Sequence, residues 1–199
     1  PRLSPRDGEG LESGAGMTER IIIAGFGGQG VMTMGKLLAE AVMCSDRQVA
    51  FIPSYGAEVR GGTANCSVVL SDETIHYPFL AEADTLIVLN QPSYDRFRSR
   101  LRPEGLLVLN SSMAATDERI EAGAGRAVLL RIPATEAAND MGNVRVANMI
   151  MLGAYAAARG GVTVETVVGI LQAELTGARA HLVDVNRRAF LKGQALAKA

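Results

Sequence analysis

The sequence has few of the residues that build disulfide frameworks, metal clusters or nucleic-acid surfaces. It contains two cysteines, Cys44 and Cys66, too few for a disulfide framework or for the thiolates that an iron–sulfur cluster normally needs. Its formal net charge is −1, so it has no excess of positive charge to favour DNA or RNA. No apolar run reaches the roughly 18 residues of a membrane span. These absences favour a protein of a reducing, cytoplasmic compartment that binds no nucleic acid and does not span a membrane.

Two parts of the chain differ in composition. Residues 1–16 are polar and rich in glycine and proline, and they lack the apolar centre of a signal peptide. We interpret them as a disordered N-terminal extension. Residues 17–199 carry the patterned segments, and a chain that is 48% hydrophobic can bury one core. The sequence therefore predicts a single domain over 17–199.

Short apolar runs of strand length alternate with segments of helical spacing. The alternation predicts an α/β fold, a doubly wound and mostly parallel sheet with helices on both faces. The last third of the chain has no convincing strand, so extra C-terminal helices should pack on this sheet. The predicted strands cover 20–24, 48–52, 64–70, 85–89, 106–109 and 127–132, and the predicted helices cover 30–43, 93–101, 134–158, 163–175 and 179 to the end.

A glycine-rich segment follows the first predicted strand and opens the first helix. It reads Gly25-Phe26-Gly27-Gly28-Gln29-Gly30 and matches the pattern G-x-G-x-x-G. A helix start offers unpaired N–H groups and a partial positive charge, and glycines let a phosphate approach them. Lys36, within the same helix, could add a positive charge. The segment therefore predicts a phosphate site, and the alternative is a tight turn that needs glycine for packing alone.

This pattern occurs most often in domains that bind NAD or FAD. Such a domain needs an acidic residue at the end of its second strand, about 20 residues further on, to bind the ribose hydroxyls. The second predicted strand ends Ile52-Pro53-Ser54 without Asp or Glu, and Asp46 precedes that strand. The sequence therefore disfavours a dinucleotide. It leaves room for another diphosphate, of which coenzyme A is the natural candidate.

A second loop that contains glycine, residues 54–65, follows the second predicted strand. Loops after the carboxyl ends of strands line the ligand crevice of a doubly wound fold, so we expect this loop beside the first glycine segment. It combines three glycines with an acid, a base and hydroxyl groups, which is too polar for a core segment. The alternative is a surface loop in which Glu58 and Arg60 form a solvated pair.

The two glycine segments together resemble the γ subunit, or γ domain, of the 2-oxoacid:ferredoxin oxidoreductases. Their pairing is more specific than either segment alone. Later segments are also similar to that family: the strand that ends in Asn90, the stretch from Gly105 to Ser112, and the pair Asn148-Met149 before an apolar run and glycine. The resemblance covers about residues 17–195.

The resemblance implies a subunit, not active alone, of an enzyme that converts a 2-oxoacid and coenzyme A to acyl-CoA and carbon dioxide. Two electrons pass to ferredoxin. Thiamine diphosphate, Mg²⁺ and iron–sulfur clusters would lie in the partner α and β subunits, and a small ferredoxin-like subunit is a further expected partner. A short, separate γ chain is similar to the 2-oxoglutarate enzymes, whereas pyruvate, branched-chain oxoacids and indolepyruvate stay open as substrates.

The γ domain of such complexes helps to form the coenzyme A site, so the resemblance implies a phosphate-binding role for the first loop and helix. The expected ligands are Gly25, Gly27, Gly28, Gln29, Gly30 and Lys36, with Asn90, Asn110, Arg145 and Asn148 as weaker candidates that could equally be helix caps. The second loop is expected at the subunit interface through Tyr55, Gly56, Glu58, Arg60, Gly61 and Gly62. No catalytic residue and no metal ligand is expected in this chain.

Two other classes of function stay open. One is an autonomous nucleotide-binding oxidoreductase with an unusual acceptor for the ribose, which purification with bound NAD or FAD would support. The other is a non-catalytic scaffold subunit whose glycine loop packs against a partner.

Overall fold

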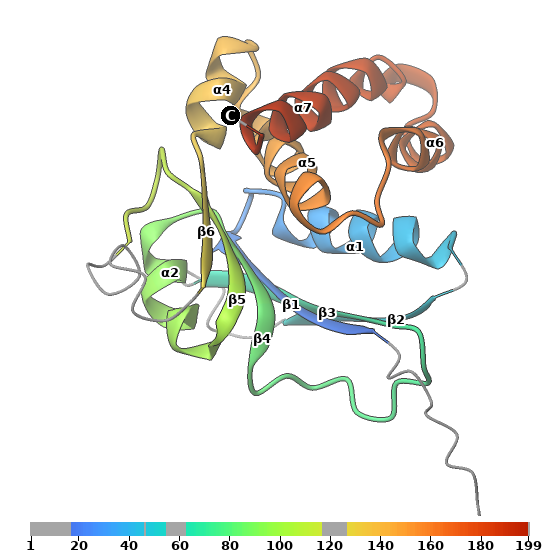
Figure 1. The fold of residues 1–199 in the computed structure, drawn as a ribbon. Coiled ribbons are helices and arrows are strands. Elements are labelled where there is room, and N and C mark those ends of the chain that lie inside the picture. Colours follow the sequence, from blue (N-terminus) through green and yellow to red (C-terminus); the bar gives the residue numbers. More distant parts are fainter. Residues whose placement is uncertain (1–16, 46, 55–62, 117–126, 199) are drawn as a thin grey trace, which may run out of the picture.

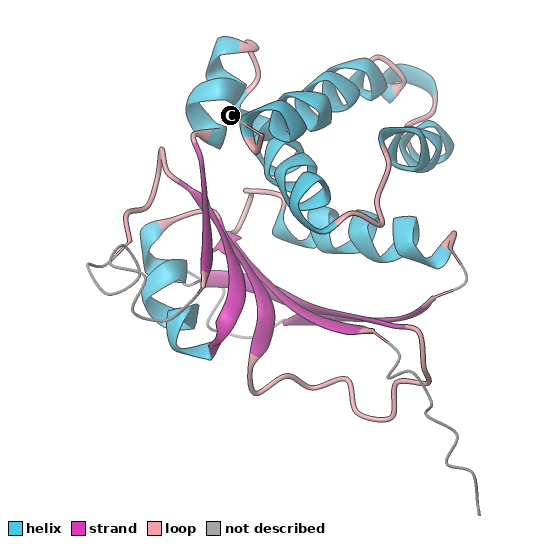
Figure 2. Cartoon of the chain, viewed as in Figure 1, coloured by secondary structure: helices cyan, strands magenta, loops and turns pink. Residues whose placement is uncertain are grey.

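The computed structural model describes residues 17–45, 47–54, 63–116 and 127–198. In this part of the chain a six-stranded sheet carries helices on both faces (Figures 1 and 2). The strands are β1 (Thr18–Phe26), β2 (Gln48–Ser54), β3 (Thr63–Ser71), β4 (Ala83–Val88), β5 (Leu101–Asn110) and β6 (Val128–Ile132). The helices are α1 (Val31–Met43), α2 (Gln91–Phe97), α4 (Ala134–Asp140), α5 (Ala147–Arg159), α6 (Val164–Glu174) and α7 (Leu182–Leu196), with short 3-10 turns η2 (Arg98–Arg100), η3 (Val144–Val146) and η4 (Gly177–Arg179).

The strands follow the order β2-β3-β1-β4-β5-β6 across the sheet. β1, β4, β5 and β6 pair in parallel, whereas β3 runs antiparallel to both β1 and β2. The predicted doubly wound, mostly parallel sheet is therefore confirmed, and β3 is its antiparallel member. In a dinucleotide-binding sheet the second strand pairs directly with the first. Here β3 separates β2 from β1, so the topology also argues against a dinucleotide site.

The central strand β1 shows why the strands have continuous apolar runs in the sequence. Ile21 and Ile23 pack in the core cluster of α1 and α5, and Ile22 and Ala24 pack in the cluster of α2 on the other face. Each of these side chains is at most 1% exposed. Because both faces of the strand are covered, no alternation with polar residues appears. Figure 1 shows α1, α5, α6 and α7 on one face and α2 on the other.

The structure corrects the extent of two predicted helices. The helix expected over 134–158 is interrupted, since α4 ends at Asp140 and Gly142 takes a left-handed φ of 76°, a conformation that glycine adopts with little strain. The helix expected over 93–101 ends at Arg100, and β5 begins at Leu101 rather than at 106. A local turn therefore ends the helical segment in both places, after Asp140 and after Arg100. No helix in the described ranges is long and apolar enough to cross a membrane.

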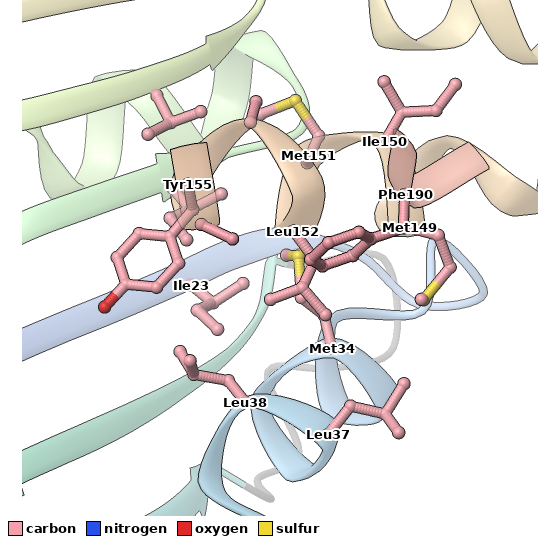
Figure 3. Packing of buried hydrophobic residues seen from close by; sticks show 14 of the residues in the cluster. Ile23, Met34, Leu37, Leu38, Met149, Ile150, Met151, Leu152, Tyr155 and Phe190 are labelled. Carbon is pink, nitrogen blue, oxygen red and sulfur yellow. The ribbon is translucent and has the colours of Figure 1, made fainter. Parts of the chain in front are cut away.

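Helices α5 and α7 cross in direct backbone contact. A Cβ on Gly193 would overlap the carbonyl group of Ile150, and a Cβ on Gly153 would overlap that of Phe190. Phe190 is fully buried, in the same hydrophobic cluster as Met34 of α1 (Figure 3). The two glycines therefore allow α7 to pack closely on α5, which in turn packs on α1 and the sheet.

We expect Gly193→Ala to lower the free energy of unfolding by about 2 kcal/mol or more, because α5 and α7 must move apart to admit the methyl group. Gly169→Ala, in the middle of α6, is the matched control. A Cβ there would meet no atom within 4 Å, so this change should stabilise the helix by about 0.5–1 kcal/mol. Denaturant unfolding of both variants measures the difference, and equal midpoints would contradict the close contact.

The two cysteines should differ in reactivity. Cys66 is fully buried, and burial raises the pKa of its thiol to about 12, whereas Cys44 is exposed at the end of α1. A thiol reagent should therefore label Cys44 alone in the native protein and both cysteines after unfolding. Cys44→Ala, which should show no native labelling, is the control. Because Cys66 ionises first in the unfolded chain, stability should also fall as the pH rises from about 9 toward 12.

Candidate functional site

The carboxyl ends of parallel strands meet at one edge of the sheet, where ligands usually bind in such folds. β1 leads into Gly25–Gly30, β4 leads into Asn90, and β5 ends at Asn110. β6 leads into α4, and η3 with the start of α5 returns the chain to the same place. The structure thus brings together the first glycine segment and the predicted residues Asn90, Asn110, Arg145 and Asn148.

The glycine segment turns the chain sharply from β1 into α1. The Gln29 N–H donates to the Phe26 carbonyl over 3.2 Å, and Gly28 and Gly30 have left-handed φ values of 92° and 76°. Gly30 is the N-cap of α1, and no side chain forms a capping hydrogen bond to the first turn of the helix. A Cβ on Gly27 or Gly28 would meet no atom within 4 Å. The loop therefore has open space over its backbone.

Gly25 and Gly30 serve close packing instead. A Cβ on Gly25 would lie 2.8 Å from Gln29 Oε1, and a Cβ on Gly30 would overlap the carboxamide of Asn148. Asn148 Nδ2 also donates to the Gly30 carbonyl over 3.3 Å. Close packing therefore explains why Gly25 and Gly30 carry no side chain, whereas Gly27 and Gly28 have open space around them.

Gln29 folds back over its own loop. Its Oε1 accepts hydrogen bonds from the Phe26 N–H and from Asn90 Nδ2, each over 2.7 Å. Its Nε2 has no hydrogen-bond partner among the described residues, and Gln29 lines a cavity. The two N–H groups of Nε2 are therefore available to a ligand.

This cavity has a volume of about 200 Å³ and opens beside the glycine loop. Arg145 at its wall is exposed, and its guanidinium forms no ion pair within the described ranges, so its charge is not neutralised. Several lining residues were not singled out from the sequence. For Leu89, Met113 and Thr135, the position just after the carboxyl ends of β4, β5 and β6 is the signal that could have found them. The lining consists of Gly28, Gln29, Leu89, Asn110, Met113, Thr135, Val144, Arg145 and Ala147.

The three predicted asparagines are held by the protein itself. Asn90 Oδ1 accepts the Ser93 N–H over 3.0 Å and caps α2. Asn110 Nδ2 donates to the Leu89 carbonyl over 3.1 Å and so joins the ends of β5 and β4. Asn90 and Asn110 are 1% exposed and Asn148 is 6% exposed. Their hydrogen bonds organise the turns around the cavity.

Lys36 lies away from this cavity, on the side of α1 that faces α6. Its ammonium pairs with Glu174 and, at 3.4 Å, with Glu40. The hydrogen bond to Glu174 and the nearby carboxylates raise the pKa of Lys36. Lys36 does not line the cavity, so its predicted contact with a coenzyme A phosphate is a hypothesis separate from the cavity.

The expected interface loop falls largely outside the described residues. Its flanking residues are described: Ser54 pairs with Asn65, and Thr63 pairs with Phe26. Both flanks therefore lie at the edge of the sheet that holds the glycine segment. The undescribed residues include all the expected contacts, Tyr55, Gly56, Glu58, Arg60, Gly61 and Gly62.

A larger cavity, of about 640 Å³, lies at the opposite edge, where β1 and β4 begin. Glu19 there accepts the Tyr155 hydroxyl over 2.8 Å and pairs with Arg159 at 3.2 Å. Burial and the Glu19 carboxylate raise the pKa of Tyr155 well above its usual value. Acids and bases balance in the lining, which holds Glu19, Asp84, Glu104, Arg47, Arg102 and Arg159. The described residues include no group of three or more His, Cys, Asp or Glu that could hold a metal ion.

The sequence matches a known family. The model of the family described as pyruvate ferredoxin/flavodoxin oxidoreductase covers residues 20–196. Ketoisovalerate oxidoreductase subunit VorA of Methanothermobacter thermautotrophicus is 42% identical over 134 residues, which are 67% of this chain and 27% of VorA. 2-Oxoglutarate synthase subunit KorC of Methanocaldococcus jannaschii is 32% identical over 92% of this chain and 95% of KorC. The matched part is thus about a quarter of VorA but nearly all of KorC.

Two solved structures share the fold. The γ subunit of a keto/oxoacid ferredoxin oxidoreductase from Geobacter sulfurreducens is 28% identical with a TM-score of 0.74, over 90% of this chain and 98% of that one. The 2-oxoglutarate:ferredoxin oxidoreductase from Magnetococcus marinus, solved with 2-oxoglutarate, coenzyme A and succinyl-CoA, is 25% identical with a TM-score of 0.81. That match covers 91% of this chain and 31% of the longer one. The fold therefore occurs both as a separate chain and as part of a longer one.

The hydrogen bonds of Asn110 should contribute strongly to stability. Asn110→Ala should lower the free energy of unfolding by about 2 kcal/mol, because it leaves the Leu89 carbonyl and the Ala134 N–H without this partner. Asn139→Ala, at an exposed position of α4, is the control and should change stability by less than about 0.5 kcal/mol. Urea unfolding compares the two variants, and an unaltered Asn110→Ala protein would show that this side chain does not hold the turn.

Proposed function

Because the chain belongs to the pyruvate ferredoxin/flavodoxin oxidoreductase family, we propose that it is the γ subunit of a 2-oxoacid:ferredoxin oxidoreductase. In the proposed reaction the bond between the carbonyl and carboxylate carbons of a 2-oxoacid breaks, and a thioester to coenzyme A forms. Carbon dioxide and the thiol proton are released, and two electrons pass to ferredoxin. This chain contributes by binding coenzyme A and by assembling with the catalytic subunits.

The observation that carries coenzyme A binding is the convergence of free donors on the cavity beside the glycine loop. Arg145 brings a guanidinium without an ion pair among the described residues, and Gln29 brings Nε2. Phosphate oxygens accept hydrogen bonds from such donors. Gly27 and Gly28 give the ligand access to the backbone, while Gly25, Gly30 and the three asparagines hold the walls.

The size of the cavity limits what it holds. Its volume of about 200 Å³ is below the roughly 300 Å³ at which sites for whole organic ligands begin. We therefore assign it to a phosphate or the diphosphate of coenzyme A, with the rest of the ligand outside. The coenzyme A present in the Magnetococcus marinus relative supports this choice of ligand.

Thiamine diphosphate, Mg²⁺ and iron–sulfur clusters belong in this proposal to the α and β subunits, and a small ferredoxin-like subunit is a further candidate partner. Thiamine diphosphate supplies the carbanion chemistry there, and the two cysteines of this chain are too few for a cluster. We place the complex in the cytoplasm. 2-Oxoglutarate is the proposed substrate because the match to KorC covers nearly all of both chains, and ketoisovalerate is the second candidate through VorA.

Purification of the native complex through a tag on this chain tests the proposal. We expect partner subunits to copurify with broad iron–sulfur absorbance, and this absorbance to bleach only when 2-oxoglutarate and coenzyme A are both added. Bleaching with ketoisovalerate and not with 2-oxoglutarate would identify ketoisovalerate as the substrate instead. A colourless chain that binds no partner would contradict the proposed function and favour autonomous nucleotide binding.

In the assembled complex, Arg145→Ala should raise the KM for coenzyme A about tenfold or more, because it removes a charge-assisted contact to phosphate. The KM for the 2-oxoacid and kcat at saturating coenzyme A should stay close to the wild-type values. Arg187→Ala, at an exposed arginine of α7 that does not line the cavity, is the control. Steady-state kinetics with each substrate varied measures both KM values, and equal increases in the two would contradict a phosphate contact.

Lys36→Ala tests the separate hypothesis from the sequence. If coenzyme A extends along α1 and displaces Glu174 from Lys36, this variant should raise the KM for coenzyme A and leave the KM for the 2-oxoacid unchanged. The same kinetic measurement decides it. An unaltered KM for coenzyme A would show that Lys36 does not bind this ligand and that its ammonium stays paired with Glu174.

A further inference from the structure

Asn90 connects the cavity to a helix that does not line it. Its Oδ1 accepts the Ser93 N–H in the first turn of α2, over 3.0 Å. Its Nδ2 donates to Gln29 Oε1 over 2.7 Å, and the same Oε1 accepts the Phe26 N–H. A continuous chain of hydrogen bonds therefore runs from α2 through Asn90 to the glycine loop.

Each hydrogen bond in this chain has a fixed direction. A backbone N–H can only donate, so Oδ1 of Asn90 must face Ser93 and the amide nitrogen must face Gln29. That nitrogen also can only donate, so Gln29 must present Oε1 to it and to the Phe26 N–H. Gln29 therefore turns Nε2, with its two donors, away from both contacts. A reversed carboxamide would set donors against donors and lose both hydrogen bonds.

We propose that Asn90 is a positioning residue that gives the cavity its preference for an anion, because it fixes the Gln29 carboxamide, together with the Phe26 N–H, with the NH₂ group toward the ligand. This rests on the proposed function, in which the anion is a phosphate of coenzyme A. Asn90 does not touch the ligand, because it is 1% exposed and does not line the cavity. Its effect passes through Gln29, since a donor at this point attracts phosphate oxygens and an acceptor repels them.

A residue that only capped α2 would affect stability and not the choice of ligand. Ser and Thr also cap helices well, but they offer one hydroxyl where Asn offers an acceptor and a separate donor group. Asn90→Ser therefore keeps the contact to Ser93 and breaks the contact to Gln29. Asn90→Thr is a second variant of the same design, for use if the first does not assemble.

The test compares coenzyme A with pantetheine, a shorter thiol without the diphosphate, as acyl acceptors of the assembled complex. Asn90→Ser should raise the KM for coenzyme A about fivefold to tenfold and leave kcat and the KM for pantetheine nearly unchanged. This increase should vanish in a Gln29→Ala background, because Asn90 acts through Gln29. Thr163→Ala, which removes the side-chain cap of α6, is the control: it should lower Tm and leave the KM for coenzyme A unaltered.

The outcomes separate this role from the proposed function. If Gln29→Ala and Arg145→Ala both leave the KM for coenzyme A unchanged, the proposed coenzyme A site is wrong and the positioning role fails with it. If those two variants raise the KM while Asn90→Ser does not, the positioning role alone is overturned. The same conclusion follows if the effect of Asn90→Ser adds in full to that of Gln29→Ala, or if pantetheine is affected as strongly as coenzyme A.

Discussion

The close contact between α5 and α7 at Gly153 and Gly193 is the constraint on which the candidate site depends. It holds α5 against α1 and the sheet, and so it helps to position the first turn of α5. The first turn of α5 carries Asn148, whose carboxamide packs on Gly30 and donates to its carbonyl. Arg145 stands just before that turn, in η3. Helix packing remote from the cavity therefore sets one wall of the cavity and the place of its free positive charge.

Amide side chains organise this edge of the sheet. Gln29, Asn90 and Asn110 each join segments that are distant in the sequence, and each carries a donor end and an acceptor end. Buried charges in the same places would need partners to offset the cost of desolvation, whereas neutral amides tie the turns together without adding charge. A phosphate at this edge would therefore meet oriented donors and the guanidinium of Arg145.

The two cavities differ in the charge of their lining as well as in volume. The larger one has acids and bases that pair with each other, as Glu19 does with Arg159, so an anion would have to compete with carboxylates already in place. The smaller one lies at the carboxyl ends of the strands and holds Arg145 without a carboxylate partner in the described part of the chain. Lys36 shows the same principle on α1, where Glu174 and Glu40 already engage its ammonium.

Much of the fold follows from the sequence by itself. Apolar runs such as Ile21–Ile23, alternating with helical spacing, predict strands covered on both faces, and the glycine segment with its neighbouring strand and helix predicts the phosphate loop. The antiparallel direction of β3 had no local signal, because strand direction is set by pairing partners. The break between α4 and α5 lies at Gly142, whose left-handed conformation could not be told in advance from that of a glycine within a helix. The roles within the site were decided by tertiary structure. The sequence placed Lys36 on the helix that follows the glycine loop, but only packing against α6 shows that Glu174 also pairs with its ammonium. Likewise, only the meeting of three turns makes Arg145 and Gln29 neighbours. Residue type and spacing specify which groups a chain carries, whereas contacts between distant segments decide which of those groups remain free to bind.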